Sequence, residues 1–320
     1  AGPALAAGCT VVIKPASETP LSALALAALA EEAGVPPGVI NVVTGSAGII
    51  GPVLTQSRIV RKLSFTGSTE IGRRLMAESA GTLKKLSLEL GGNAPFIVFE
   101  DADLDLAVQG AMVSKYRNSG QTCVCSNRFL VHERVHDAFV GKFSAAVSRL
   151  ALGAGWEPGV TQGPLINMAA ITRIEAALEQ ASADGAKIVC GGKRSVLGGL
   201  FFEPTVITGV RNDSVLAQSE LFGPVAPVIR FSSDEEAIRL ANDSEFGLAS
   251  YIYTRDINRM FRVSEALEYG MVGVNEGLIS TEVAPFGGVK ASGFGREGSK
   301  YGIDEYMEKK YVCIGNVTGD

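Results

Sequence analysis

A cysteine in a glycine-bearing turn is the side chain of this sequence best suited to nucleophilic chemistry. Cys123 follows Gly120-Gln121-Thr122, directly after the expected end of a helix. Free backbone N–H groups in such a turn are expected to lower the pKa of the thiol and to hold an oxyanion during a reaction. The competing interpretation is a buried structural cysteine, so the residues that accompany Cys123 decide between the two.

A carboxylate is the first such partner. Glu89 ends the apolar stretch Leu86-Ser87-Leu88 and is followed by Leu90-Gly91-Gly92, so its side chain emerges where a strand is expected to stop. In open α/β sheets, ligands bind outside the carboxyl ends of the strands. The alternative for Glu89 is a solvated charge at the end of a strand.

The segment Phe65-Thr66-Gly67-Ser68-Thr69 leads from an expected strand into an expected helix. Small residues and free N–H groups at the start of a helix suit a pyrophosphate group. An ordinary turn has the same features, so this segment indicates a dinucleotide site only together with other motifs.

The sequence His132-Glu133-Arg134-Val135-His136 matches the H-E-x-x-H pattern of zinc metalloproteases and contains the only two histidines. That site requires both imidazoles on one helical face. Residues 128–131 are instead predicted as a strand, with a helix beginning near His136, so we expect no metal site. Cys123 and Cys125 lack a second ligand pair, and we interpret them as redox-sensitive thiols. We hypothesise that oxidation joins them in a strained disulfide that a reductant reverses.

The elements around these residues predict an α/β fold, because short apolar runs alternate with amphipathic stretches for nearly the whole chain. After a strand over residues 10–14, Thr19 is the expected N-cap and Pro20 the first helical residue of a helix over residues 21–32. The break at Gly91-Gly92 predicts a domain boundary. Further strands are predicted over residues 40–43, 62–65, 86–90, 95–99, 187–190 and 224–231, and further helices end near residues 81 and 118.

Composition limits the classes of protein. Of 320 residues, 46% are hydrophobic and 20% are charged, which is typical of a compact globular protein. The net charge is −5 and no basic run suits a nucleic-acid backbone. The longest apolar run, over residues 23–30, is far shorter than the roughly 20 residues of a membrane span. Five cysteines, an odd number, fit a reducing compartment, so we expect a cytoplasmic protein. From the charge and the apolar runs, we expect neither nucleic-acid nor membrane partners.

The two ends of the sequence lead to two further expectations. The chain starts Ala1-Gly2-Pro3, without Met or a signal peptide, and we expect a piece of a longer protein. Residues 309–314 alternate like an exposed strand with one apolar face, which favours pairing with another chain.

Four motifs together resemble the aldehyde dehydrogenase superfamily in their order and spacing. They are LELGGN at residues 88–93, GQTC at 120–123, ELFGP at 220–224 and PFGG at 285–288. Within the superfamily, the chain is most similar to succinate-semialdehyde dehydrogenases, through residues 115–127 and 295–302.

The resemblance implies an aldehyde dehydrogenase-like α/β fold. Residues 1–92 would be the C-terminal part of a Rossmann-like dinucleotide-binding domain, residues 93–302 an α/β catalytic domain, and residues 303–320 a C-terminal oligomerisation strand. It also implies a reaction in which the Cys123 thiolate attacks an aldehyde and hydride leaves the thiohemiacetal for NAD(P). Glu89 then activates the water that hydrolyses the thioester. The full-length protein would be a homodimer or homotetramer, acting on succinate semialdehyde in GABA degradation.

The resemblance also implies a cofactor site. Gly67 and Ser68 would hold the pyrophosphate, Glu220 and Phe222 would position the nicotinamide ribose and ring, and Leu90 would belong to the same site. Their alternatives are ordinary turn and packing roles.

The adenosine end of that site bears on cofactor choice. Lys14 would contact the adenosine ribose, and Ser17 stands where many NAD-dependent relatives carry a Glu. A Glu at position 17 would repel the 2′-phosphate of NADP, and Ser17 does not. We therefore expect NADP to be favoured over NAD.

For the substrate, the resemblance points to Arg117 with Ser280 at the carboxylate of a short aldehyde acid, and to Phe286 in the same site. A surface helix Arg is the alternative. The family's Pro-Trp-Asn segment and a second substrate Arg are expected upstream of Ala1, so we expect the isolated fragment to be inactive. Alternatives are a dehydrogenase for glutarate semialdehyde or for a broader range of aldehydes, and a non-catalytic relative.

Overall fold

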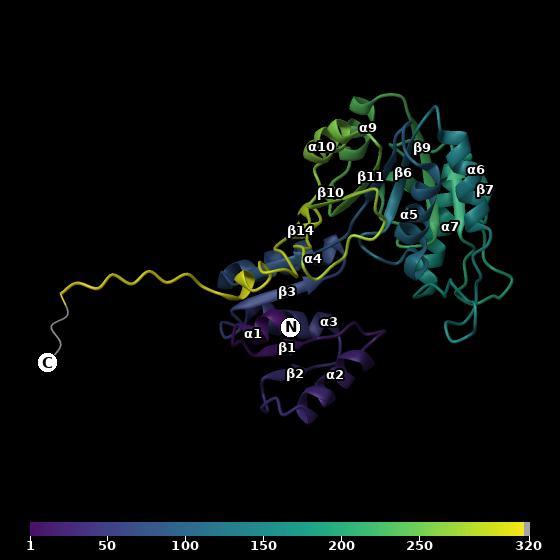
Figure 1. Ribbon diagram of the computed structural model, residues 1–320. Helices are drawn as coiled ribbons and strands as arrows, with labels where there is room; N and C mark the ends of the chain where they lie inside the picture. The colour runs from purple at the N-terminus through teal and green to yellow at the C-terminus, as the bar shows by residue number, and fades with distance from the viewer. Residues whose placement is uncertain (317–320) are drawn as a thin grey trace.

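Seven strands form the main sheet of the computed structural model, which describes residues 1–316 (Figure 1). Their order is β12-β11-β5-β6-β9-β8-β7, and all neighbours are parallel except β7 and β8. Central strands such as β6 are buried along their whole length, as expected of a parallel sheet covered on both faces. The strands are β5 (Ala94–Val98), β6 (Ser126–His132), β7 (Lys187–Cys190), β8 (Thr205–Thr208), β9 (Val225–Phe231), β11 (Ala249–Tyr253) and β12 (Met271–Val274).

Helices cover both faces of this sheet, because successive side chains of each buried strand point to opposite faces. Phe96 and Val98 of β5 join an apolar cluster with helices α5 (Leu104–Tyr116) and α6 (His136–Val147). Ile97 and Phe99 join a second cluster on the other face. Its helices are α7 (Met168–Ala183), α8 (Val215–Gln218), α9 (Asp234–Asn242) and α10 (Ile257–Ala266). We call this part of the molecule the large lobe.

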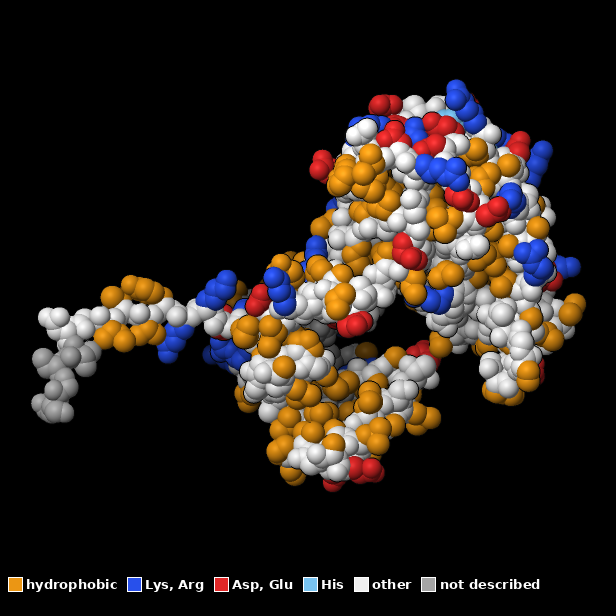
Figure 2. Space-filling model, viewed as in Figure 1, with side chains coloured by type: hydrophobic (Ala, Val, Ile, Leu, Met, Phe, Trp, Pro, Cys, Tyr) orange, Lys and Arg blue, Asp and Glu red, His pale blue; other side chains and the backbone are white. Residues whose placement is uncertain are grey.

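Residues 1–90 form a second body, here called the small lobe, below the large lobe in Figure 1. Strands β1 (Val11–Ile13) and β2 (Ile40–Val42) form a parallel pair, and β3 (Lys62–Thr66) lies parallel to β4 (Lys85–Glu89). The surface is hollowed between the two lobes (Figure 2). The helices of the small lobe are α1 (Gly2–Ala6), α2 (Leu21–Glu32), α3 (Ala47–Gln56) and α4 (Thr69–Ser79).

The chain passes from one lobe to the other directly after β4. Residues 90–93 separate β4 of the small sheet from β5 of the large sheet, which is where the sequence predicts a domain boundary. A late segment returns, because β14 (Gly293–Phe294) pairs antiparallel with β4. A short pair, β10 (Phe246–Gly247) with β13 (Val289–Lys290), lies near this second crossing.

The α/β prediction is confirmed, with local differences. Helix α2 has the predicted bounds, but Pro20 rather than Thr19 occupies its N-cap, where no side-chain hydrogen bond is made. Strands β8, β11 and β12 were not predicted. A second difference concerns residues 307–316, which form no strand and run away from the body of the molecule (Figure 1). A strand needs a hydrogen-bonding neighbour, which this segment lacks.

Residues 317–320, the last part of the predicted oligomerisation segment, lie outside the described residues. Across residues 1–316, no helix has both the length and the apolar character needed to cross a bilayer.

Candidate active site

Glu89 is the last residue of β4, and its side chain is buried rather than solvated. Only 4% of the residue is exposed, and within residues 1–316 its Oε2 atom has no hydrogen-bond partner. Burial, with a smaller contribution from the nearby Glu297 carboxylate, raises the pKa of Glu89 to about 8, and Arg296 opposes both. The alternative of a solvated strand-end charge is therefore wrong, and Glu89 can take up or release a proton near neutral pH.

Cys123 lies in the turn that connects α5 to β6 of the large lobe. The backbone just before it reverses sharply, because Asn118, Ser119 and Gly120 all have positive φ, between 52° and 75°. After it, the buried Tyr251 hydroxyl donates to the Val124 carbonyl oxygen at 2.7 Å. These contacts fix the turn from both sides.

A glycine brings the end of β4 and this turn together. A Cβ atom on Gly92 would lie 2.2 Å from the Cys123 carbonyl oxygen, so no larger residue fits. Cys123 itself is half-buried and packs at the edge of the apolar cluster of α5 and α6. The thiol and the carboxylate predicted as partners thus come from different lobes and meet at the first crossing.

The prediction of a lowered thiol pKa is wrong for this state of the protein. Burial raises the pKa of Cys123 to about 11, and the Glu220 and Glu89 carboxylates contribute in the same direction. The backbone N–H groups of Cys123 and Val124 do favour the thiolate, as the turn suggests, but they are outweighed. The turn sequence shows the N–H donors and cannot show carboxylates contributed from elsewhere.

Glu220 is the third titratable side chain of this cluster, and it comes from the loop between α8 and β9. Its Oε1 atom accepts a hydrogen bond from the Gly92 backbone N–H at 3.0 Å, and a Cβ atom on Gly91 would lie 2.7 Å from its Oε2. Burial raises the pKa of Glu220 to about 7. Two residues on, Phe222 has a φ of 50°, so the loop holds a left-handed backbone at a non-glycine residue.

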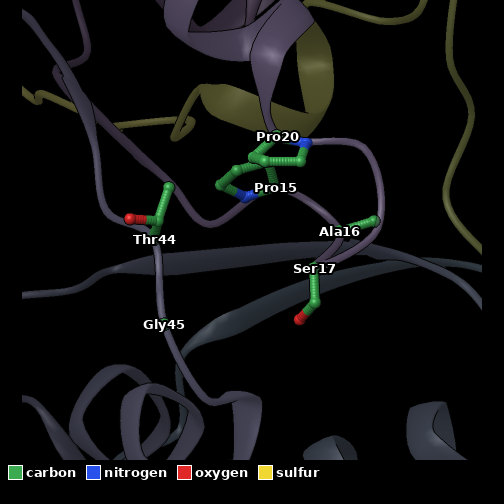
Figure 3. A pocket seen from close by; sticks show the side chains of 6 residues that line it. All are labelled: Pro15, Ala16, Ser17, Pro20, Thr44 and Gly45. Carbon is green, nitrogen blue, oxygen red and sulfur yellow. The ribbon is translucent and has the colours of Figure 1, made fainter.

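A pocket of about 270 Å³ opens on the small lobe beside Ser17. Figure 3 shows the exposed Ser17 side chain in this pocket, opposite the strand-to-helix turn at Thr44 and Gly45. Lys14 lies at the end of β1, and its Nζ donates to the Pro15 carbonyl at 2.7 Å. Sequence reasoning missed Thr44 and Gly45, although a strand-to-glycine-to-helix turn was the available signal.

Three other predicted cofactor residues lie close to Glu89 or to the start of α4. Gly67 donates its N–H to the Glu89 carbonyl at 3.0 Å, and Ser68 caps α4 by accepting from the Ile71 N–H at 3.4 Å. Leu90 is buried, and its side chain fills the space that a Cβ atom on Gly72 would need. Leu90 therefore packs against α4.

The predicted substrate residues are only partly brought together. Phe286 packs against the same apolar cluster as Cys123. Arg117 is half-buried at the end of α5, near enough to favour the ionised form of the Cys125 thiol. Ser280 is exposed in the loop after β12.

The two histidines lie on different elements, as predicted. His132 ends β6 and its Nδ1 accepts from the Arg134 N–H at 3.2 Å, whereas His136 starts α6 and bonds Asp137 at 2.9 Å. In the part of the chain that the structure describes, no group of three or more His, Cys, Asp or Glu side chains is arranged to hold a metal ion.

Next to the Cys123 turn lies a second thiol, Cys125, with a buried lysine, Lys115. Cys123 and Cys125 are both free, and the Cys125 Sγ atom donates to the Lys115 carbonyl at 3.2 Å. Lys115 is fully buried, and burial lowers its pKa while the Cys125 thiol and Glu220 oppose that change. Sequence reasoning missed Lys115, because its place on α5 gives no sign that it points inward. The Cys123–Cys125 disulfide stays a prediction.

Comparison with known proteins agrees with this geometry. The family model described as the aldehyde dehydrogenase family matches residues 1–312. Glutarate-semialdehyde dehydrogenase of Pseudomonas aeruginosa is 64% identical over 317 residues, which cover 99% of this chain and 66% of that protein. The NADP(+) succinate-semialdehyde dehydrogenase of Escherichia coli is 62% identical over 315 residues, which cover 98% of this chain and 65% of that protein.

A solved structure gives the same result. The crystal structure of succinate-semialdehyde dehydrogenase from Burkholderia pseudomallei has a TM-score of 0.97 and 66% identity, covering 98% of this chain and 65% of that one. The chain thus spans about two thirds of the length of the relatives it matches.

Proposed function

Because this chain belongs to the aldehyde dehydrogenase family, we propose that the protein oxidises an aldehyde to its carboxylic acid with a nicotinamide cofactor. The observation that carries the proposal is that the Cys123 thiol lies close enough to the Glu89 and Glu220 carboxylates for both to raise its pKa, where the chain crosses between lobes. A nucleophile and a base near pKa 8 are the groups that acyl transfer through a thioester requires.

In this mechanism the Cys123 sulfur bonds to the aldehyde carbon and the thiol proton passes to the carbonyl oxygen, which gives a thiohemiacetal. When bound, the cofactor would supply a hydride acceptor; loss of the hydride from carbon and of the hydroxyl proton to solvent leaves a thioester on Cys123. Glu89 accepts a proton from a water molecule, the hydroxide adds to the thioester carbon, and the Cys123 sulfur leaves. The carboxyl pKa of about 8 makes Glu89 a base of suitable strength at neutral pH.

The residues present fit a dinucleotide. The eleven-residue helix α4 begins directly after Ser68, its N-terminal end favours a negatively charged phosphate, and the pocket at Ser17 has room for a ribose. We propose that Lys14, Ser17, Gly67, Ser68, Leu90, Glu220 and Phe222 form the cofactor site. Residues 1–92 would then belong to the cofactor domain and residues 93–302 to the catalytic domain.

We propose that NADP is favoured over NAD. Ser17 offers a hydroxyl in the pocket where a carboxylate would repel a 2′-phosphate, and the E. coli relative carries NADP(+) in its name. Structures of betaine aldehyde dehydrogenase from Staphylococcus aureus, 40% identical, are complexes with NAD+. Ser17→Glu should lower kcat/KM with NADP+ and leave or raise it with NAD+. Equal wild-type efficiency with the two cofactors would reject this preference.

We propose succinate semialdehyde as the substrate, with Arg117 and Ser280 at its carboxylate and Phe286 beside the aldehyde. Glutarate semialdehyde, one methylene longer, is a second candidate because two Pseudomonas relatives with that name are 64% and 62% identical. Arg117→Ala should raise KM for both acids much more than for an uncharged aldehyde, and Arg117→Lys should restore part of the loss. Equal effects on all three aldehydes would place the carboxylate elsewhere.

We further propose that the protein works in the cytoplasm as a homodimer or homotetramer. Exposed apolar side chains of Tyr311, Val312 and Ile314 on the extended C-terminal segment favour contact with a second copy. Sedimentation of the protein with and without residues 309–320 tests this, and a monomer in both cases would contradict it.

A further inference from the structure

The buried side chain of Asn127 bonds the loop that carries Glu220 on both sides of that residue. The Asn127 Nδ2 atom donates to the Ser219 carbonyl at 2.6 Å, and its Oδ1 atom accepts from the Leu221 N–H at 3.4 Å. Ser219 and Leu221 are the two neighbours of Glu220 in the chain, so Asn127 binds the backbone on both sides of this residue. Only 3% of Asn127 is exposed.

A second amide extends the same network. The Asn127 Nδ2 atom also donates to Asn93 Oδ1 at 2.8 Å, and the Asn93 Nδ2 atom donates to the Ala217 carbonyl at 2.8 Å. Asn93 is completely buried. Both hydrogens on the Asn127 amide nitrogen therefore have acceptors, and the loop is tied to the segment just before β5 as well as to β6.

The network closes at the carboxylate. Gly92, which precedes Asn93, donates its backbone N–H to Glu220 Oε1. Glu220 is thus held at its carboxylate by the segment before β5 and at its backbone by Asn127 of β6, four residues after Cys123. The Phe222 backbone in the same loop is left-handed at a φ of 50°, a conformation that persists only where neighbouring contacts fix it.

We propose that Asn127 is a positioning residue for Glu220 and thereby for the nicotinamide half of the cofactor. This rests on the proposed function, in which Glu220 binds the nicotinamide ribose. Asn127 acts through the loop backbone. Its loss leaves the Ser219 carbonyl and the Leu221 N–H without their partners in the interior, so the loop shifts and the carboxylate leaves its position.

The test compares a whole cofactor with its adenosine half. Dissociation constants of NADP+ and of adenosine 2′,5′-bisphosphate are measured by titration calorimetry for wild type, Asn127→Leu and the milder Asn127→Ser. We expect Kd for NADP+ to rise about tenfold or more in Asn127→Leu, the effect of losing roughly one net hydrogen bond. We expect Kd for the bisphosphate, which lacks the nicotinamide half, to change less than about twofold.

A matched control has the same geometry elsewhere. The Asn242 side chain donates to the Ala266 carbonyl at 2.8 Å and accepts from the Glu268 N–H at 3.0 Å, again on both sides of one residue. Asn242 is half-buried and its amide nitrogen has one acceptor rather than two, so Asn242→Ser should cost somewhat less stability than Asn127→Ser, and it should leave both dissociation constants unchanged. A general loosening of the protein would instead affect both variants alike.

A double variant decides whether Asn127 acts through Glu220. In a Glu220→Ala background, Asn127→Leu or Asn127→Ser should add no further weakening of NADP+ binding. Three results would each overturn the proposal. The effects of the Asn127 and Glu220 variants on NADP+ binding could be fully additive, or the Asn127 variants alone could leave the Kd for NADP+ unchanged. The Asn127 variants could also weaken the binding of NADP+ and of the bisphosphate equally. Failure of the wild type to bind either ligand would instead reject the proposed function on which it rests.

Discussion

The pKa of Cys123 gives the most demanding test of the site geometry. At pH 8, a thiol with a pKa of about 11 is about 0.1% ionised, whereas an ordinary exposed cysteine with a pKa of about 8.5 is about 24% ionised. The thiolate of the weaker acid is more nucleophilic, by about 10- to 20-fold for this difference in pKa. We therefore expect Cys123 to exchange with an aromatic disulfide about 10 to 25 times more slowly than an exposed cysteine.

The assay follows the rate of that exchange between pH 7 and pH 10 without cofactor. Cys125→Ala removes the neighbouring thiol, and the exposed Cys313 serves as the reference within the same molecule. The Cys123 rate should rise about tenfold for each pH unit over this range, because the thiolate fraction does. Glu220→Gln should raise the rate at a fixed pH, since the Glu220 carboxylate is the larger of the two charges that disfavour the thiolate.

Two results would refute this reasoning. A rate that levels off near pH 8 or 9 would mean that the thiol is an ordinary acid and that the two carboxyl groups do not act on it. A slower reaction in Glu220→Gln would mean that the Glu220 carboxylate takes up the thiol proton rather than opposing its loss.

Four further predictions concern the groups around this thiol. Glu89→Gln should release one equivalent of reduced cofactor quickly in stopped flow and then turn over about 10²-fold more slowly, because the thioester lacks its base; unchanged steady-state turnover would contradict the role. Burial raises the Glu89 pKa to about 8, so the folded state holds a proton that the unfolded state releases, and the native protein loses stability as pH rises from the ordinary carboxyl range toward 8. The melting temperature of Glu89→Gln should fall less than that of the wild type over the same pH range. Tyr251→Phe leaves the buried Val124 carbonyl unpaired and should cost about 1–3 kcal/mol by denaturant unfolding; a value near zero would show that this bond is dispensable. Gly92→Ala places a methyl group against the Cys123 carbonyl oxygen and should abolish activity. Gly81→Ala is the control, because its methyl group meets no atom within 4 Å, and it should be active.

Much of the fold follows from local sequence. Helix α2 and strands β3 and β4 lie where periodicity and turn residues place them, because each is specified by residues close together in the chain. Strands β8 and β12 were missed, since neither four-residue strand has an alternating pattern of buried and exposed side chains: β8 is buried at three successive residues, and β12 is half-buried along most of its length. The motif around Cys123 and the strand end at Glu89 were also visible, because each is one continuous segment.

The electrostatics of the site could not be predicted in the same way. The thiol pKa depends on Glu220, which is 97 positions away in the sequence and reaches Cys123 only through the fold. Asn127 was likewise invisible, because its partners flank Glu220 and follow Glu89 in other segments. The sequence shows which titratable side chains the protein has. It does not show which of them are buried next to one another in the folded protein, and that proximity sets their pKa values.

The two crossings between the lobes bear on how the protein unfolds. The segment after β4 and the return of β14 onto β4 are the two places where the backbone joins the lobes, and a few side-chain hydrogen bonds, such as Arg73 to Glu245, add to them. Two bodies linked in this way have separate cores, so their melting transitions need not coincide. A ligand that contacts both lobes binds only while both are folded, so its binding free energy stabilises the two lobes together against unfolding. In calorimetry, the heat-capacity trace should therefore merge toward a single peak as the cofactor concentration rises.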